Sequence, residues 1–202
     1  MIGQITERVL SLAERDTAAL FERHPDFTIA VNLSAADLHD AASIARVREL
    51  AARHRQRKNR FIVEISERGV LQTDLAQQAI GQFREAGVSV AIDDFGTGYS
   101  CLSYLASLKL DILKIDKAFV DSLGTQAPTS RVAQYIIAMA QALDLTVIAE
   151  GVETLQQFEI LRSQRVQLAQ GYLFSRPLRM ADLLERIGES EARHRRLESS
   201  AA

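Results

Sequence analysis

Two adjacent carboxylates, Asp93 and Asp94, stand where an apolar stretch of the chain ends. Val88, Val90 and Ile92 alternate with small residues just before them, which is the pattern of a buried β-strand. Consecutive side chains on a strand point to opposite faces, so both acids can serve one ligand only where the backbone turns. A lone Asp94 before a glycine-containing loop is typical of a helix cap. The pair, together with similar strand ends elsewhere, favours a site that uses both carboxylates.

Polar side chains also end the other predicted strands. The strand-end residues are Asn32, Glu64, Asp93 with Asp94, Lys114, Glu150 and Gln170. Four carboxylates that meet at the carboxyl ends of neighbouring strands repel each other by roughly 4 kcal/mol per pair at ~4 Å and an effective dielectric of ~20. One lysine cannot offset that repulsion. The oxygen ligands favour Mg²⁺ or Mn²⁺ over zinc. Adjacent aspartates suit two ions about 3.5–4 Å apart, which would bind a phosphate and activate a water.

Each of these residues also has a structural interpretation. Asn32 alone is more typical of a helix cap than of a metal ligand. Glu67 and Glu153 each follow a strand-end acid by three residues, where a helix dipole favours an acid in the first turn. Lys114 has apolar neighbours, so we expect it to be buried, with Asp116 two residues further on as its acidic partner. Taken together, the residues favour a metal site.

Histidine and cysteine chemistry is not expected at these strand ends. The four histidines fall in predicted helices, loops or the C-terminal tail, and none ends a strand, so a histidine metal site is excluded. Cys101 has no histidine near it in sequence and is more typical of a small packing residue than of a nucleophile. As the only cysteine it cannot form an intrachain disulfide, which fits a reducing compartment. Asp37 is expected at an exposed helix start, away from the site.

Alternating strand and helix patterns must position these residues. The predicted helices cover about 5–21, 38–50, 75–83, 102–108, 130–143, 155–161 and 180–187. Six strand-then-helix units in a row indicate an α/β fold with a parallel sheet. A doubly wound sheet would concentrate its ligands at one switch point, whereas here all six strands end in polar residues, so we predict a (β/α) barrel of the TIM type. A closed barrel has eight strands, so the sequence predicts an incomplete, modified barrel that lacks its first two strands.

Composition sets the class of protein. At 202 residues and 47% hydrophobic, the chain suits one domain, predicted over 1–188, followed by a polar tail over 189–202 that is frayed or disordered. A net charge of −2 gives no reason to expect DNA, RNA or an anionic membrane as partner. No apolar run approaches the roughly 20 residues that span a bilayer, and the first 15 residues lack the apolar core of a signal peptide. We therefore expect a cytoplasmic location.

The motifs resemble those of a known family in both order and interval. They are Asn32-Leu33-Ser34, Glu64-Ile65-Ser66-Glu67, Asp93-Asp94-Phe95-Gly96-Thr97-Gly98-Tyr99-Ser100, Lys114-Ile115-Asp116, Glu150-Gly151-Val152-Glu153 and Gln170-Gly171-Tyr172. From about residue 5 to residue 187 the chain resembles the EAL-domain family, bacterial phosphodiesterases that linearise the second messenger cyclic di-GMP. The resemblance implies a modified barrel whose first strand is antiparallel.

The resemblance also implies a role for each matching residue. The residues that match metal ligands are Asn32, Glu64, Asp93, Asp94 and Glu150. Glu150 is further implied to help activate the attacking water, and Lys114 matches the lysine beside that water. Glu67 matches a residue that steadies the loop after Asp94, a loop that also helps form dimers. Glu153 and Gln170 match supporting positions, and Asp116 is predicted to support the site as the partner of Lys114.

Two departures from the family keep two function classes open. The Glu-Ala-Leu segment that names the family has no counterpart in this chain, so one metal ligand is expected to be absent, and Cys101 replaces a serine. The first class is metal-dependent hydrolysis of cyclic di-GMP to linear pGpG, impaired in this chain. The second is an inactive module that binds cyclic di-GMP or a protein. The retained acids favour the first, and the open sheet edges predict a homodimer.

Overall fold

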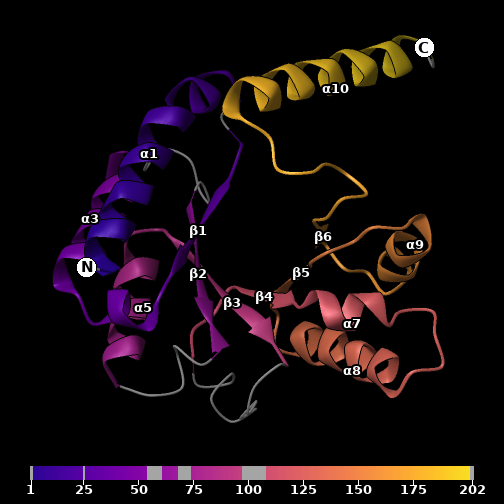
Figure 1. The fold of residues 1–202 in the computed structure, drawn as a ribbon, viewed down its shortest axis with the longest axis horizontal. Helices are drawn as coiled ribbons and strands as arrows, with labels where there is room; N and C mark the ends of the chain where they lie inside the picture. Colours follow the sequence, from indigo (N-terminus) through magenta and orange to yellow (C-terminus); the bar gives the residue numbers. More distant parts are fainter. Residues whose placement is uncertain (1, 25, 54–60, 68–73, 97–107, 201–202) are drawn as a thin grey trace.

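The computed structural model describes residues 2–24, 26–53, 61–67, 74–96 and 108–200 (Figure 1). Six parallel strands form one sheet in the order of the sequence. They are β1 (Ile29–Leu33), β2 (Phe61–Ser66), β3 (Ser89–Phe95), β4 (Ile112–Ile115), β5 (Thr146–Ala149) and β6 (Leu168–Ala169). Within the described residues β1 and β6 are the outer strands, and the sheet curls into a half-barrel between them. The predicted α/β fold, an incomplete barrel of about six units, is confirmed.

Helices surround the curled sheet, and most of them lie on its outer side. They are α1 (Ile2–Arg23), α2 (Ala35–Leu38), α3 (Ala41–Arg53), α5 (Asp74–Glu85), α7 (Lys117–Asp121), α8 (Pro128–Ala142), α9 (Leu155–Ser163) and α10 (Met180–Ser200). The last of them, α10, projects away from the sheet (Figure 1). In Figure 1, α1, α3 and α5 lie beside the first strands, and α7, α8 and α9 lie beside the last ones. None of the helices described is long and apolar enough to cross a membrane.

The two faces of the sheet carry different side chains because the strand period is two. The outward residues join the main core under the helices: Val31, Leu33, Val63, Ile65, Val90, Ile92, Leu113, Ile115, Val147 and Ala149. The inward face holds a small separate cluster of Ala91, Ile112 and Ile148, with Ile62 packed against it. This inner cluster forms an apolar floor beneath the carboxyl ends of the strands.

Helix caps fix where several helices begin after their strands. Ser34 and Asp37 form a reciprocal capping box at the start of α2, and Thr154 and Gln157 form another at the start of α9. Asp116 caps α7, since its carboxylate accepts a hydrogen bond from the Ala118 amide at 2.8 Å. Each cap ends a strand-to-helix connection that begins at the carboxyl end of a strand.

Three sequence predictions need correction. The helix expected over 38–50 is two helices, α2 and α3. The helix expected to end near 187 continues as α10 to Ser200, so residue 188 marks no element boundary. Asp37 is not exposed: it is 2% accessible, and its carboxylate accepts hydrogen bonds from the hydroxyls of Thr6 at 2.8 Å and Ser34 at 2.6 Å. The expected helix over 102–108 falls almost wholly outside the described residues, and Cys101 also lies outside them.

Candidate functional site

The predicted site residues sit directly above the apolar floor, one inward position further along each strand. Ile62, Ala91, Ile112 and Ile148 form the floor, and two residues later come Glu64, Asp93, Lys114 and Glu150. Neighbouring strands are parallel but staggered, since Glu64 is opposite Ala91 and Lys114 is opposite Ile148. The strand period puts the four charged side chains on the inner face, and the stagger of the curled sheet places them in one charged layer, from β2, β3, β4 and the residue after β5.

Lys114 is the centre of this layer. Its side chain is only 4% exposed, and its ammonium contacts three carboxylates. The Nζ atom lies 2.7 Å from Glu64 Oε2, 3.0 Å from Asp93 Oδ1 and 2.5 Å from Glu150 Oε1. Asp116, the partner predicted for Lys114, caps α7 instead, because the backbone leaves the strand after Ile115. The acids that pair with the lysine come from β2, from β3 and from the residue that follows β5.

Burial and charge shift the pKa values within the layer. Burial alone would lower the pKa of Lys114, but hydrogen bonds to Glu150 and Glu64 outweigh burial and raise that pKa above the usual lysine value. Burial raises the pKa of Glu150, and the charges of Asp93 and Glu64 act in the same direction while Lys114 opposes them. Lys114 is therefore a fixed cation, and Glu150 is a better proton acceptor than an ordinary glutamate.

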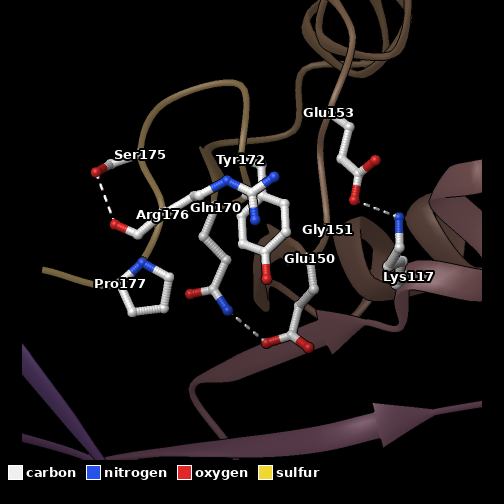
Figure 2. Close-up of a pocket in the computed structure, with 10 residues that line it drawn as sticks. Lys117, Glu150, Gly151, Glu153, Gln170, Tyr172, Ser175, Arg176 and Pro177 are labelled. Carbon is white, nitrogen blue, oxygen red and sulfur yellow. Dashed lines mark hydrogen bonds and ion pairs between the residues drawn. The ribbon is translucent and has the colours of Figure 1, made fainter.

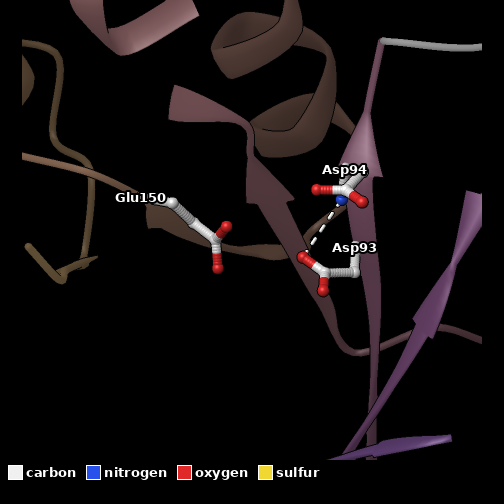
Figure 3. A group of neighbouring side chains, drawn as sticks. All are labelled: Asp93, Asp94 and Glu150. Atoms are coloured by element: carbon white, nitrogen blue, oxygen red, sulfur yellow. Dashed lines mark hydrogen bonds between the residues drawn. The ribbon is translucent and has the colours of Figure 1, made fainter. Parts of the chain in front are cut away.

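A register irregularity lets two consecutive aspartates face one site. The pairing of β3 with β4 shifts between Ile92 and Phe95, and Asp94 has a left-handed φ of 55°. As a result, Asp93, Asp94 and Glu150 each offer an oxygen, all within 4.8 Å of one another (Figure 3). Burial raises the pKa of Asp94, and the charges of Asp93 and Asp116 add to the effect. The turn needed for both acids to serve one site is present.

Glu67 holds the turn that follows the aspartates. Its side chain is buried, and Oε2 accepts a hydrogen bond from the Gly96 amide at 3.1 Å. Gly96 has a φ of 95°, and a Cβ there would lie 2.8 Å from the Phe119 ring, so this position requires glycine. The loop beyond Gly96 lies outside the described residues.

The other predicted residues lie around the charged layer. Gln170 donates from Nε2 to Glu150 Oε1 at 2.9 Å. Asn32 is opposite Glu64 in the β1–β2 register, and its side chain is exposed on the outer strand. Glu153 lies apart from the layer and pairs with Lys117 at 2.9 Å. The structure thus leaves Asn32, Glu153 and Asp116 at the margin and brings six predicted residues together, namely Glu64, Asp93, Asp94, Lys114, Glu150 and Gln170.

A pocket of about 510 Å³ opens next to Glu150 (Figure 2). Its lining comes from the starts of α7 and the β5–α9 connection and from the segment after β6. The lining residues are Lys117, Glu150, Gly151, Glu153, Gln170, Gly171, Tyr172, Ser175, Arg176 and Pro177. The Arg176 guanidinium stacks 4.4 Å from the Tyr172 ring centre, so the pocket offers a cation and an aromatic face beside the acids.

The EAL domain family model matches residues 1–177 of this chain. The chain belongs to the EAL domain family. Among curated relatives it is 42% identical over 187 residues to the cyclic di-GMP phosphodiesterase NbdA of Pseudomonas aeruginosa, an alignment that covers 92% of this chain and 24% of NbdA. This EAL chain therefore spans about a quarter of the length of that relative.

Solved EAL structures share the fold. The PaMucR phosphodiesterase in complex with c-di-GMP superposes with a TM-score of 0.83 at 36% identity, covering 90% of this chain and 74% of PaMucR. BlrP1 of Klebsiella pneumoniae, in a manganese and cy-diGMP complex, superposes with a TM-score of 0.70 at 32% identity, covering 82% of this chain and 44% of BlrP1.

The donor set of this EAL chain fits a divalent cation. Four carboxylates, those of Glu64, Asp93, Asp94 and Glu150, gather around one ammonium, and three of them already offer oxygens within 4.8 Å of one another. Uncompensated negative charge and oxygen donors are what Mg²⁺ and Mn²⁺ bind in proteins. The acidic site predicted from the strand ends is therefore present as a candidate metal site.

Sequence reasoning missed the pocket residues beyond Tyr172 and the side chain of Lys117. Lys117 lies three residues after Lys114, and its contacts are with Asp121 and with Glu153 in another connection. Arg176 and Pro177 belong to the continuation of the Gln170-Gly171-Tyr172 motif. Extending that motif by a few residues would have pointed to Arg176 and Pro177, whereas nothing local in the sequence marks Lys117.

Proposed function

We propose that this EAL chain carries the site for metal-dependent hydrolysis of cyclic di-GMP to linear pGpG. The observation that carries the proposal is the buried Lys114 ammonium held by Glu64, Asp93 and Glu150, with Asp94 beside them. Its relative NbdA is a cyclic di-GMP phosphodiesterase, and PaMucR was solved with c-di-GMP. The charged layer and the family likeness support the same reaction.

Five side chains are proposed to hold two Mg²⁺ or Mn²⁺ ions: Asn32, Glu64, Asp93, Asp94 and Glu150. Bound divalent ions would supply charge neutralisation at the phosphate and a water of lowered pKa. Asp93 and Asp94 converge because of the register shift at the end of β3. Glu67 keeps that turn in place through the Gly96 amide, and its role is therefore to position the two aspartates.

Lys114 and Glu150 are the proposed catalytic residues. The water oxygen bonds to phosphorus, the bond from phosphorus to the ribose 3′ oxygen breaks, and that oxygen leaves with a proton. Both described contacts of the Glu150 carboxylate, from Lys114 and from Gln170, fall on Oε1. Oε2 is therefore the oxygen that would serve a metal ion and the attacking water, and the raised pKa of Glu150 favours uptake of the proton of that water. Lys114 stays charged and orients Glu150 beside the phosphate.

The partners and location follow from the same reading. The proposed domain covers 1–188, binds cyclic di-GMP in the cytoplasm and forms a homodimer. Among the residues that the structure describes, β1 and β6 each pair with one other strand, and this gives the dimer proposal its physical basis, since such sheet edges favour association. Sedimentation of the 202-residue chain at micromolar concentration tests it, and a stable monomer would count against it.

Turnover by the chain, followed by chromatographic separation of pGpG, tests the main proposal. Glu150→Gln and Lys114→Ala should each remove turnover, whereas the exposed controls Glu159→Gln and Lys109→Ala should retain it. Ca²⁺ should inhibit, because it prefers longer bonds and a looser shell and so misplaces the water. Binding of cyclic di-GMP without any product would refute hydrolysis and favour an inactive binding module.

A further inference from the structure

Lys117 contacts the backbone segment that carries Glu150, although it neither joins the charged layer nor belongs to the residues assigned above. We propose that Lys117 is a positioning residue: it clamps the segment 150–153 from outside and so fixes the Glu150 carboxylate beside Lys114. This inference rests on the proposed function, since it concerns how a residue of that site is held.

The first contact is between the Lys117 stem and Gly151. Gly151 directly follows Glu150 and has a left-handed φ of 67°. A Cβ added there would lie 2.5 Å from Lys117 Cγ and 2.7 Å from its Cβ and Cδ. The methylene stem thus lies flat on the bare backbone at this glycine, and any side chain at position 151 would push it away. Backbone and stem fit only because the residue is glycine.

The second contact is made by the Lys117 ammonium at the far end of the same segment. Nζ lies 2.9 Å from Glu153 Oε1 and 2.9 Å from Asp121 Oδ1 (Figure 2 shows the Glu153 pair). Glu153 is further fixed because its amide donates to Gln157 Oε1 at 2.8 Å. Lys117 therefore contacts the segment 150–153 at two points, one residue after Glu150 and three residues after it.

The segment after β6 holds 150–153 through the Gln170 side chain, which donates to Glu150 Oε1 at 2.9 Å, and through two backbone hydrogen bonds. The Val152 amide donates to the Gln170 carbonyl at 3.0 Å, and the Leu173 amide donates to the Val152 carbonyl at 3.0 Å. Lys117 closes the other side from the first turn of α7, three residues after Lys114 on the same chain segment. Lys114 and Lys117 thus tie the Glu150 segment to β4 and α7 from two directions.

An ordinary surface ion pair is the alternative interpretation. The side chains of Lys117 and Glu153 are 45% and 43% exposed, and exposed ion pairs contribute little to stability. Such a pair would change little when removed. A clamp predicts something different: global stability hardly changes, while the segment 150–153 opens more often and the cation site that uses Glu150 weakens.

The test compares Lys117→Met and Lys117→Arg with Arg162→Met in the full chain. Methionine keeps most of the stem and removes the charge, arginine keeps both, and Arg162→Met removes an exposed ion pair with Glu159 on α9. We expect hydrogen exchange at the amides of 151–153 to rise severalfold in Lys117→Met only. Calorimetric Mn²⁺ affinity should fall about tenfold in the same variant, as for other residues that orient a metal ligand, with unfolding temperatures similar in all variants.

Each result decides a separate point. Wild-type exchange and wild-type Mn²⁺ affinity in Lys117→Met would overturn the clamp, and so would Lys117→Arg exchanging as fast as Lys117→Met. A wild-type chain that binds no Mn²⁺ would refute the proposed function instead. The exchange measurement needs no metal, so it still decides whether Lys117 holds the segment in that case.

Discussion

Replacing Asp94 by asparagine should stabilise the metal-free chain and destabilise the metal-bound one. Oxygens of Asp93, Asp94 and Glu150 lie within 4.8 Å of one another, so each carboxylate pair repels by about 3.5 kcal/mol at an effective dielectric of about 20. Asparagine removes two of these repulsions, a further one from Asp116, and one attraction to Lys114. Because Asp94 is exposed, water screens most of this, and we expect a net gain of about 1 kcal/mol, or about 2–4 °C in unfolding temperature.

Adding Mn²⁺ should reverse the order of stability. A ligand that binds only the folded state stabilises it according to its concentration relative to Kd. If the variant loses tenfold in affinity, it forgoes about 1.4 kcal/mol of that stabilisation at saturating metal, which exceeds the gain from relieved repulsion. Thermal unfolding at pH 7 in EDTA and again in excess Mn²⁺ measures both differences with one pair of proteins.

Asp144→Asn is the matched control. Asp144 is exposed and has a left-handed φ of 54°, close to the 55° of Asp94, but it lies after α8 outside the acidic group. It therefore reports what asparagine does for this backbone conformation alone. A gain in Asp144→Asn equal to that in Asp94→Asn, or a change of the same sign with and without Mn²⁺, would refute the electrostatic reasoning.

The gain should also depend on pH with a defined sign. Burial, followed by the charges of Asp93 and Asp116, raises the folded-state pKa of Asp94 above 3.8. A raised folded-state pKa means that the charged carboxylate opposes folding. The wild-type chain is therefore destabilised at pH values above the folded-state pKa of Asp94, and it is not destabilised below the unfolded-state pKa. The advantage of Asp94→Asn should be full at pH 7 and vanish as the pH falls below about 3.8.

Three further outcomes follow from other contacts. Lys114→Met should lower the free energy of unfolding, measured in urea, by about 3–5 kcal/mol, because it leaves buried carboxylates without their cation. The control Lys109→Met replaces an exposed lysine and should change that free energy by under about 0.5 kcal/mol. Equal effects of the two substitutions would contradict the buried cluster. Gly171→Ala should lower the unfolding temperature, since its Cβ would lie 2.2 Å from the Val152 carbonyl oxygen. The control Gly81→Ala lies on α5, where a Cβ meets nothing within 4 Å, and should raise the unfolding temperature. An unchanged unfolding temperature in Gly171→Ala would refute the close approach. Glu14→Gln should lower the free energy of unfolding at pH 7 but not below the folded-state pKa of Glu14, which the hydrogen bond with Arg46 lowers from 4.5. If the variant is still less stable than wild type in acid, the Glu14–Arg46 pair is not the cause.

The positions of the strand-end residues were predictable because a strand has a period of two. Ile112 and Lys114, or Ile148 and Glu150, must share a face, and parallel strands must bring those faces to one edge. The partner of Lys114 was predicted wrongly because the same period was extended past Ile115, where the chain has already left the strand and Asp116 caps a helix. A cap is decided by the local turn, which a period does not describe.

Contacts between distant segments were the part that sequence reasoning could not supply. Asp37 was expected to be exposed because it lies in a helix start, but Thr6 of α1, 31 residues away, covers it and donates a hydrogen bond. The shift of β3 against β4, which turns Asp93 and Asp94 to one site, depends on how two strands meet. Such features need the packed structure, since neither partner carries a local mark of the other.

The sequential order of the strands has a consequence for how the site is assembled during folding. Paired residues of neighbouring strands are 20 residues apart between Ile148 and Leu168 and 34 apart between Ile112 and Thr146, so each pairing closes a loop of modest size. The sheet can therefore grow one unit at a time, with no pairing between its first and last described strands to wait for. Glu64, Asp93 and Lys114 come from the inner strands, whereas Asn32 comes from the outer strand β1. We expect the inner acids and their lysine to gather early. The side chains supplied by the two outer strands, Asn32 in β1 and Gln170 just after β6, should be placed last and lost first when the chain begins to unfold.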